Sequence, residues 1–202
     1  GFKMGDKALQ DGWSDSIDPL CGYGMGMTAE NLVEKYSIDR KEMDEFAVQS
    51  HRKAAKAWED GAFADEVIPI EVPPASRKDS AITFDRDETI RADTSVEKLA
   101  KLPSAFKKGG SVTAGNACGM SDGATSLVIT SREKAKQLGT PPLFSIVSYA
   151  AAAVDPSVMG EGPGFAIPMA LEKAGMTLAE MDFIEVNEAF ASQVLTNERK
   201  LE

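Results

Sequence analysis

Residues 112–119 read Val-Thr-Ala-Gly-Asn-Ala-Cys-Gly, and the pattern of the chain changes around them. After Met120, short apolar runs of strand-like composition alternate with segments of helical spacing that end in glycine. This alternation is typical of an α/β protein whose helices pack against a sheet. Helical patterns dominate before residue 112. The sequence therefore predicts a mostly helical part, residues 1–120, and the opening of an α/β part, residues 121–202.

Strands are expected after Met120 where Val, Ile, Leu and Phe gather, over residues 124–130, 143–153 and 183–186. Helices are expected between these strands, over residues 131–138 and 167–174, because a glycine follows each one. A further helix follows the last strand. A sheet of so few strands is incomplete, and the chain ends inside a helical pattern, so we expect a truncated sequence.

The first part opens with a glycine-rich loop that leads into a helix. Asp39 caps a second helix, in which apolar residues recur at three-and-four spacing until Gly61. Residues 66–72 are expected to form a strand, and the polar stretch 76–87 a loop or hairpin. Ser95 then caps a short helix.

Composition excludes several classes of function. The chain has 22 Lys and Arg against 32 Asp and Glu, and this net charge of -10 disfavours nucleic acid as a partner. No run approaches the roughly 18 apolar residues of a membrane span. Cys21, Cys118 and the single histidine, His51, are too few for a zinc cluster, so no metal is expected. Two separated thiols favour a reducing compartment, and we expect the cytoplasm or an organelle matrix.

Residues 112–119 are one of four distinctive segments. The others read Met-Gly-Met-Thr-Ala-Glu-Asn at 25–31, Asp-Pro-Ser-Val-Met-Gly at 155–160, and Val-Asn-Glu-Ala-Phe-Ala at 186–191. In this order and at these spacings the four segments resemble the thiolase family, and the resemblance covers essentially the whole chain.

The resemblance implies a fold. Thiolases have two similar α/β halves in a five-layered αβαβα core, and a mostly helical lid inserted in the first half covers coenzyme A. By this resemblance, residues 1–120 would be the lid, and residues 121–202 would be the first, truncated part of the C-terminal half.

The resemblance also implies an activity. Thiolases transfer acyl groups between coenzyme A thioesters through a cysteine acyl-enzyme, either in thiolysis of 3-ketoacyl-CoA or in formation of acetoacetyl-CoA. The nucleophilic cysteine would precede this chain, and the catalytic histidine and second cysteine would follow it, so residues 1–202 alone are expected to be inactive. Coenzyme A is a substrate, no cofactor is expected, and the full enzyme would be a homodimer or homotetramer.

Two other functions compete with this one. The protein could be a non-catalytic, thiolase-like carrier of acyl-CoA or lipid, which loss of the nucleophilic cysteine would indicate. Alternatively, the chain could serve only as an assembly element, against which coenzyme A binding would argue.

The resemblance assigns coenzyme A contacts in the first part. Arg91 aligns with an arginine at the adenine and ribose phosphate end, although an isolated arginine is more often a solvated charge. Ala114, Gly115 and Cys118 would contact the pantetheine arm, with Cys118 at a position where thiolases usually have serine. The alternative is a tight turn in which glycines and small residues only let backbone segments meet. Met25 would line the same ligand.

Asn187 is the expected catalytic residue in the second part. It would hold the water that, with the absent histidine, forms an oxyanion hole for the thioester oxygen. A structural asparagine that satisfies backbone groups is the alternative. Met159 and Phe190 would line the acyl pocket, where plain core packing is the alternative.

Two further positions bear on chemistry and specificity. Cys21 is followed by glycine, as the nucleophile is in thiolases, but it lies in the lid and far from any strand-to-helix turn of the core, so a structural role is expected. Short-chain acetoacetyl-type thiolases often have a histidine just before the first Met-Gly, where this chain has Gly24. The smaller residue favours a broader-chain, β-oxidation-like 3-ketoacyl thiolase of fatty acid metabolism.

Overall fold

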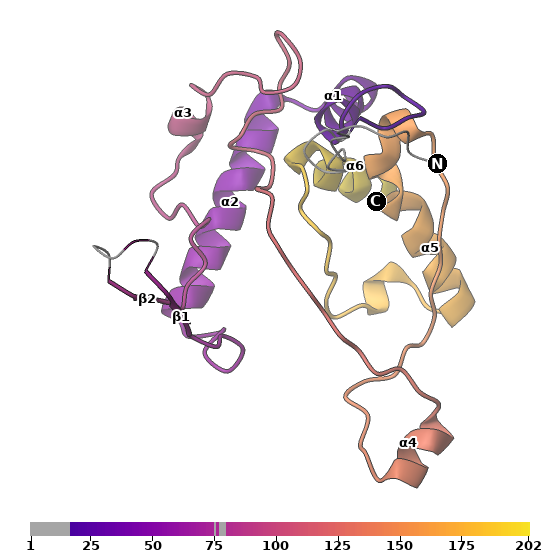
Figure 1. Cartoon of the computed structure of the whole chain (residues 1–202). Helices are drawn as coiled ribbons and strands as arrows, with labels where there is room; N and C mark the ends of the chain where they lie inside the picture. Colours follow the sequence, from indigo (N-terminus) through magenta and orange to yellow (C-terminus); the bar gives the residue numbers. More distant parts are fainter. Residues whose placement is uncertain (1–16, 75, 77–79) are drawn as a thin grey trace, which may run out of the picture.

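The computed structural model describes residues 17–74, 76 and 80–202. Two groups of elements are visible in Figure 1. Helices α1 (Met25–Tyr36), α5 (Pro163–Ala174) and α6 (Ala191–Leu201) lie together with the 3-10 helix η1 (Pro156–Glu161). The long helix α2 (Arg40–Glu59) runs from this group toward a small hairpin.

The packing of α1, α2 and α6 forms the first hydrophobic core. Ile38, Met43, Ala191 and Leu195 are buried together in it, with Val33, Tyr36 and Phe46 against them. The α2 helix begins where predicted, because the Asp39 side chain accepts a hydrogen bond from the Lys41 backbone amide. Residues far apart in the chain thus meet around one core.

A second, smaller core lies between α2 and the short helix α3 (Val96–Leu99). Ala47, Val48 and Leu99 are buried in it. The predicted cap is confirmed, since Ser95 accepts from the Lys98 backbone amide at 3.3 Å. This core fixes the segment that leads into residues 112–119.

The hairpin consists of β1 (Ile70–Val72) and β2 (Ile82–Phe84). The strands are antiparallel, and Ile70 pairs with Phe84. The predicted strand over 66–72 is therefore confirmed only in its last three residues. The hairpin alternative for residues 76–87 fits β2, although residues 77–79 lie outside the described part of the chain.

The helices predicted after residue 120 are confirmed, and one of them starts earlier than predicted. Helix α4 (Arg132–Leu138) ends at Gly139, whose φ is 66°, and α5 ends at Gly175, whose φ is 67°. Only glycine adopts this left-handed conformation readily. The α5 helix starts earlier than the predicted residue 167 because Pro163 suits a first helical turn. A capping box between Thr177 and Glu180 opens the 3-10 helix η2 (Leu178–Glu180).

The three strands predicted after residue 120 are not formed among the described residues. Residues 124–130, 143–153 and 183–186 run without strand pairing. Val128, Leu143 and Phe183 are 95%, 96% and 94% exposed, respectively. A strand needs a neighbour for its backbone hydrogen bonds, and none lies beside these segments in the described structure.

None of the described helices combines the length and the apolar character required to cross a membrane.

Candidate functional site

Backbone contacts join residues 112–119 to the segment before α6. The Cys118 amide donates to the Ala189 carbonyl oxygen at 2.9 Å, and the Ala191 amide donates to the Asn116 carbonyl oxygen at 3.0 Å. Ala117 and Phe190 form an antiparallel bridge between these bonds. The structure therefore places two of the distinctive sequence segments side by side.

A cavity of about 300 Å³ opens beside this junction. Its walls come from α2, from residues 115–118, and from the segment that precedes α6. Three predicted site residues line it: Gly115, Cys118 and Asn187. The Cys118 and Asn187 side chains are exposed, so both are accessible to a ligand.

Close packing explains the glycine at position 115. A Cβ atom there would lie 2.6 Å from Leu102 Cδ1 and 2.7 Å from Leu99 Cδ2, too close for real contacts. The loop thus lies directly on the second core. Ala114, the neighbouring predicted contact, is exposed.

Arg91 is bonded to a residue that lines the same cavity. Its backbone amide donates to His51 Nδ1 at 3.2 Å, and His51 lines the cavity from α2. The Arg91 side chain is exposed. Its predicted role toward a phosphate group stays a prediction.

Of the three residues predicted to contact the ligand through apolar atoms, Phe190 lies near this cavity and two methionines do not. Phe190 is adjacent to the cavity through its bridge with Ala117, and its ring meets the edge of Phe106 at 6.0 Å between centroids. Phe106 also covers Gly26, the neighbour of Met25, so tightly that a Cβ there would overlap its ring. Met25 and Met159 do not line the cavity, and Met159 is 46% exposed in η1.

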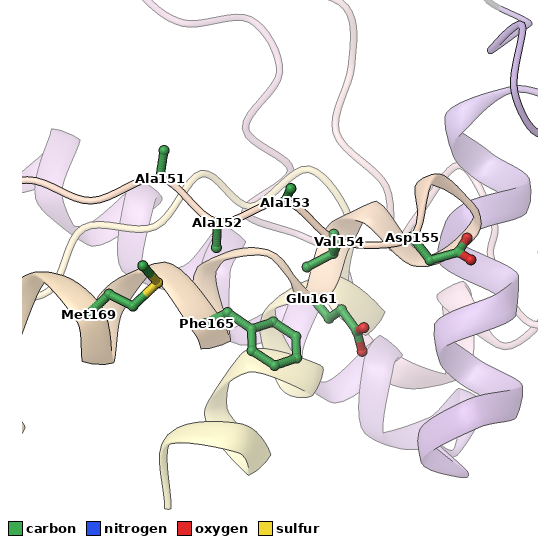
Figure 2. A pocket seen from close by; sticks show the side chains of 8 residues that line it. All are labelled: Ala151, Ala152, Ala153, Val154, Asp155, Glu161, Phe165 and Met169. Carbon is green, nitrogen blue, oxygen red and sulfur yellow. The ribbon is translucent and has the colours of Figure 1, made fainter.

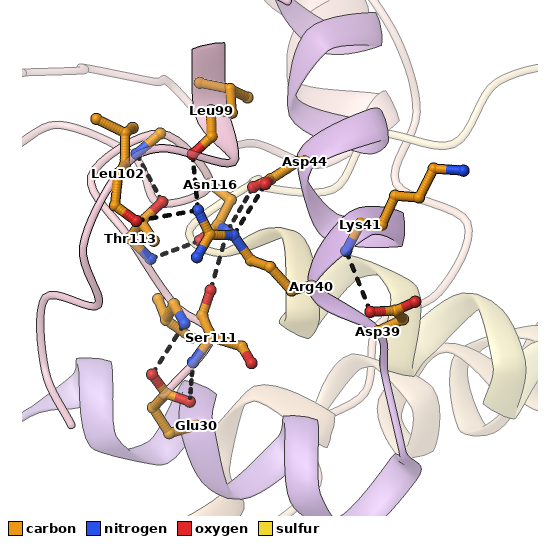
Figure 3. A network of polar contacts seen from close by, with 12 residues as sticks. Glu30, Asp39, Arg40, Lys41, Asp44, Leu99, Leu102, Ser111, Thr113 and Asn116 are labelled. Atoms are coloured by element: carbon orange, nitrogen blue, oxygen red, sulfur yellow. Dashed lines mark hydrogen bonds and ion pairs between the residues drawn. The ribbon is translucent and has the colours of Figure 1, made fainter. Parts of the chain in front are cut away.

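Sequence reasoning missed a buried polar network that holds the loop (Figure 3). Glu30 of α1 accepts from the Ser111 amide at 3.0 Å and the Val112 amide at 2.8 Å. On the α2 side, Asp44 accepts from Asn116 Nδ2 at 2.9 Å. The available signal was a charged residue on the apolar face of a helix, since Asp44 lies three and four residues before Ala47 and Val48.

Glu188 links the segment before α6 to α2. Its Oε2 accepts a hydrogen bond from Ser50 Oγ of α2 at 2.5 Å. Ser50 and Glu188 both line the cavity, so this bond closes one of its walls.

A larger hollow of about 480 Å³ lies between α5 and residues 151–155, and contains none of the predicted site residues (Figure 2). Glu161 at its end is 5% exposed and accepts from Lys35 Nζ at 2.8 Å and from Tyr36 Oη at 2.5 Å. Burial opposes ionisation of Glu161, yet these two donors hold its pKa below the usual range. Burial and the Glu161 carboxylate raise the pKa of Tyr36 to about 12. This cluster ties α1 to η1.

Across residues 17–74, 76 and 80–202, no group of three or more His, Cys, Asp or Glu side chains is arranged to hold a metal ion.

Comparison with known proteins points to one family. Residues 1–133 match the family model for the thiolase N-terminal domain, and residues 140–202 match the model for the thiolase C-terminal domain. An acetyl-CoA acetyltransferase of Pseudomonas aeruginosa is 51% identical over 206 residues, which cover 100% of this chain and 51% of that protein. A probable acetyl-CoA acyltransferase of Staphylococcus epidermidis is 46% identical, covering 100% of this chain and 51% of its own length.

Solved structures agree. The Bacillus anthracis acetyl-CoA acetyltransferase is 48% identical, with a TM-score of 0.86, and covers 100% of this chain and 50% of its own. Human mitochondrial 3-ketoacyl-CoA thiolase in complex with CoA is 45% identical, with a TM-score of 0.85 and the same coverage. The chain thus spans about half the length of the curated relatives it matches.

Proposed function

Because this chain belongs to the thiolase family and has part of its α/β fold, we propose that the complete protein transfers acyl groups between coenzyme A thioesters. The reaction is either thiolysis of 3-ketoacyl-CoA or formation of acetoacetyl-CoA. One observation of this structure carries the proposal. The hydrogen bond from Cys118 to Ala189 joins the predicted pantetheine loop to the segment of the predicted catalytic asparagine.

In the proposed thiolysis, a cysteine thiolate outside residues 1–202 attacks the 3-keto carbon, the bond between C2 and C3 breaks, and acetyl-CoA leaves after C2 takes up a proton. The thiol of coenzyme A then takes the acyl group from the cysteine. Formation of acetoacetyl-CoA follows the same steps in reverse. Asn187 holds a water that donates a hydrogen bond to the thioester oxygen as negative charge develops there. The exposed position of Asn187 at the cavity supports this role, because a water must reach its side chain.

The coenzyme A contacts follow the same proposal. The pantetheine arm lies along Ala114, Gly115 and Cys118, whose backbone and thiol supply polar partners for its amides. The exposed Arg91 meets the phosphate end, where a guanidinium can bind a phosphate with two hydrogen bonds. Met25 is proposed to contact coenzyme A, and Phe190 and Met159 the acyl chain. Both methionines lie outside the walls of the cavity beside Asn187, so they would line a part of the site beyond it.

The proposal also covers the domain organisation, the inactivity of this chain alone, the assembly and the location of the protein. Residues 1–120 form the lid over coenzyme A, and the C-terminal half, expected from residue 121, matches its family model from residue 140. The chain alone is inactive because the nucleophile and base lie elsewhere in the protein. The homodimer or homotetramer, the cytoplasmic location, and a role in β-oxidation are predictions at the same level.

The test is thiolysis of acetoacetyl-CoA by the complete protein in the presence of free coenzyme A. Asn187→Ala should lower kcat about 100-fold with little change in KM, because its interaction forms mainly in the transition state. Glu185→Gln, an exposed change two residues earlier, serves as the control and should leave kcat unchanged.

Two outcomes would contradict the proposal. A complete protein that binds coenzyme A without turnover would instead be a thiolase-like carrier. Turnover with full kcat in Asn187→Ala would remove Asn187 from the mechanism.

A further inference from the structure

Asn116 is the most fully bonded side chain of the loop at 112–119. It is 3% exposed. Its Oδ1 accepts from the Thr113 amide at 2.8 Å, and its Nδ2 donates to the Ser111 carbonyl oxygen at 3.2 Å and to Asp44 Oδ1 at 2.9 Å. Both amide hydrogens and the amide oxygen are therefore committed, and they fix the path of the loop itself.

The backbone of Asn116 reaches the other half of the site. Its carbonyl oxygen accepts from the Ala191 amide at 3.0 Å, immediately before the contacts of Ala117 with Phe190 and of Cys118 with Ala189. A displacement of Asn116 would therefore move the loop and the segment that carries Asn187 together.

Asp44 connects Asn116 to the second core. It is 1% exposed, and its Oδ2 accepts from Arg40 Nε at 2.8 Å. Arg40 Nη2 then donates to the carbonyl oxygens of Leu99 at 2.7 Å and Leu102 at 3.2 Å. A buried carboxylate is tolerated only when it is paired and hydrogen-bonded, and Asp44 meets both conditions (Figure 3).

The network ends on the loop at 112–119, which indicates a role beyond helix packing. Glu30, 2% exposed on α1, also directs both of its oxygens to the loop, at the Ser111 and Val112 amides. Two buried carboxylates from two different helices thus end on the same loop. Helix packing alone requires neither of these contacts, since apolar side chains would supply it without the cost of burying charge.

We infer that Asn116, held by Asp44, is a positioning residue that sets the coenzyme A loop and the Asn187 segment relative to each other. The inference rests on the function proposed above. It predicts that loss of the pair weakens coenzyme A binding and turnover together, because both halves of the site are attached to Asn116.

The test uses the complete protein and coenzyme A, with binding measured by titration calorimetry and turnover by thiolysis of acetoacetyl-CoA. Asp44→Asn keeps the size of the side chain but turns an acceptor into a donor that opposes either Arg40 or Asn116. We expect the Kd for coenzyme A to rise and kcat to fall, each about 10-fold.

A double-mutant cycle provides the decisive measurement. Asn116→Ala removes the group through which Asp44 holds the loop, so adding Asp44→Asn to it removes little more. We expect Asp44→Asn to change Kd and kcat by less than about threefold in the Asn116→Ala background.

Two control variants on α2 separate positioning from stability. Glu45→Gln changes the neighbouring carboxylate, whose side chain is 48% exposed, and should leave Kd unchanged. Ala55→Gly, at a site 7% exposed farther along α2 and outside the cavity walls, should lower the melting temperature without altering Kd.

The outcomes are distinguishable. Asp44→Asn with a lower melting temperature but wild-type Kd and kcat would overturn the inference, as would a double variant in which the effects of Asp44→Asn and Asn116→Ala on Kd add in full. A wild type that binds coenzyme A without turnover would overturn the proposed function, while the Kd comparison would still decide the inference. A wild type that does not bind coenzyme A would overturn both.

Discussion

The Cys118 backbone amide donates a hydrogen bond to the Ala189 carbonyl oxygen at 2.9 Å. Because this bond involves backbone atoms only, substitutions of the Cys118 side chain leave the junction of the loop and the Asn187 segment intact. The contribution of the side chain to ligand binding can therefore be measured separately from the architecture of the site.

Cys118→Ser should strengthen coenzyme A binding in the complete protein. A hydroxyl is a better hydrogen-bond partner than a thiol, so we expect the KM for coenzyme A to fall about threefold. Cys118→Val, similar in size but without a polar atom, should raise this KM. Equal KM values for the wild type and both variants would show that the pantetheine arm does not contact this side chain.

The helix boundaries were predictable from sequence because their signals are local. Ser131 and Gly139 bound α4 as expected, since a cap and a left-handed glycine act on the nearest backbone groups. The strand predicted over residues 143–153 was wrong because a strand depends on a neighbouring strand and not on local signals. Strand pairing needs a neighbour, and Leu143 and Val147 face solvent in the described structure.

The candidate site was predictable only in part. Gly115, Cys118 and Asn187 were identified through the resemblance, and the structure gathers them at one cavity. The network through Asp44 was not identified, because its partner Asn116 lies far away in sequence. Sequence spacing within α2 shows that Asp44 shares a face with buried residues, but not which loop it meets.

Glu161 should make the stability of the protein depend on acid pH. Its pKa is held below the ordinary value of 4.5, mainly by Lys35 and Tyr36 acting against burial. The folded state therefore binds this proton less readily than the unfolded state. The resulting stabilisation is present above pH 4.5 and is lost as the pH falls through the lower folded-state pKa.

Glu161→Gln should consequently lower the melting temperature of the complete protein by about 4 °C at neutral pH. The difference from the wild type should shrink as the pH falls below 4.5, where the wild type also loses the charge. Glu45→Gln, at the exposed surface of α2, is the matched control and should show no such dependence. A difference that is constant from pH 3 to 7 would assign the effect to packing.

The exposed apolar segments after residue 120 predict opposite behaviour for the isolated chain and the complete protein. Val128 and Leu143 are 95% and 96% exposed. We expect residues 1–202 expressed alone to bind a hydrophobic dye and to self-associate. Val128→Lys with Leu143→Lys should reduce both effects in the isolated chain.

In the complete protein, the same double substitution should lower the melting temperature, because we expect the additional chain to supply neighbouring strands that cover these residues. Gln137→Lys with Thr140→Lys, at two exposed positions near the end of α4, adds the same charge and should be neutral in both forms. If the double substitution is also neutral in the complete protein, these segments stay at the surface there.

Gly24 should influence the chain length of the acyl substrate. It precedes α1 with φ at -82° and ψ at 168°, a conformation open to any residue, so Gly24→His introduces a bulky side chain without backbone strain. The imidazole would lie next to Met25, which the proposed function places against the ligand. We expect kcat/KM for medium-chain 3-ketoacyl-CoA to fall about 10-fold relative to acetoacetyl-CoA, as roughly one or two methylene groups lose their space. Gly24→Ala should change this ratio little, and an unchanged ratio in Gly24→His would mean that another residue limits the acyl chain.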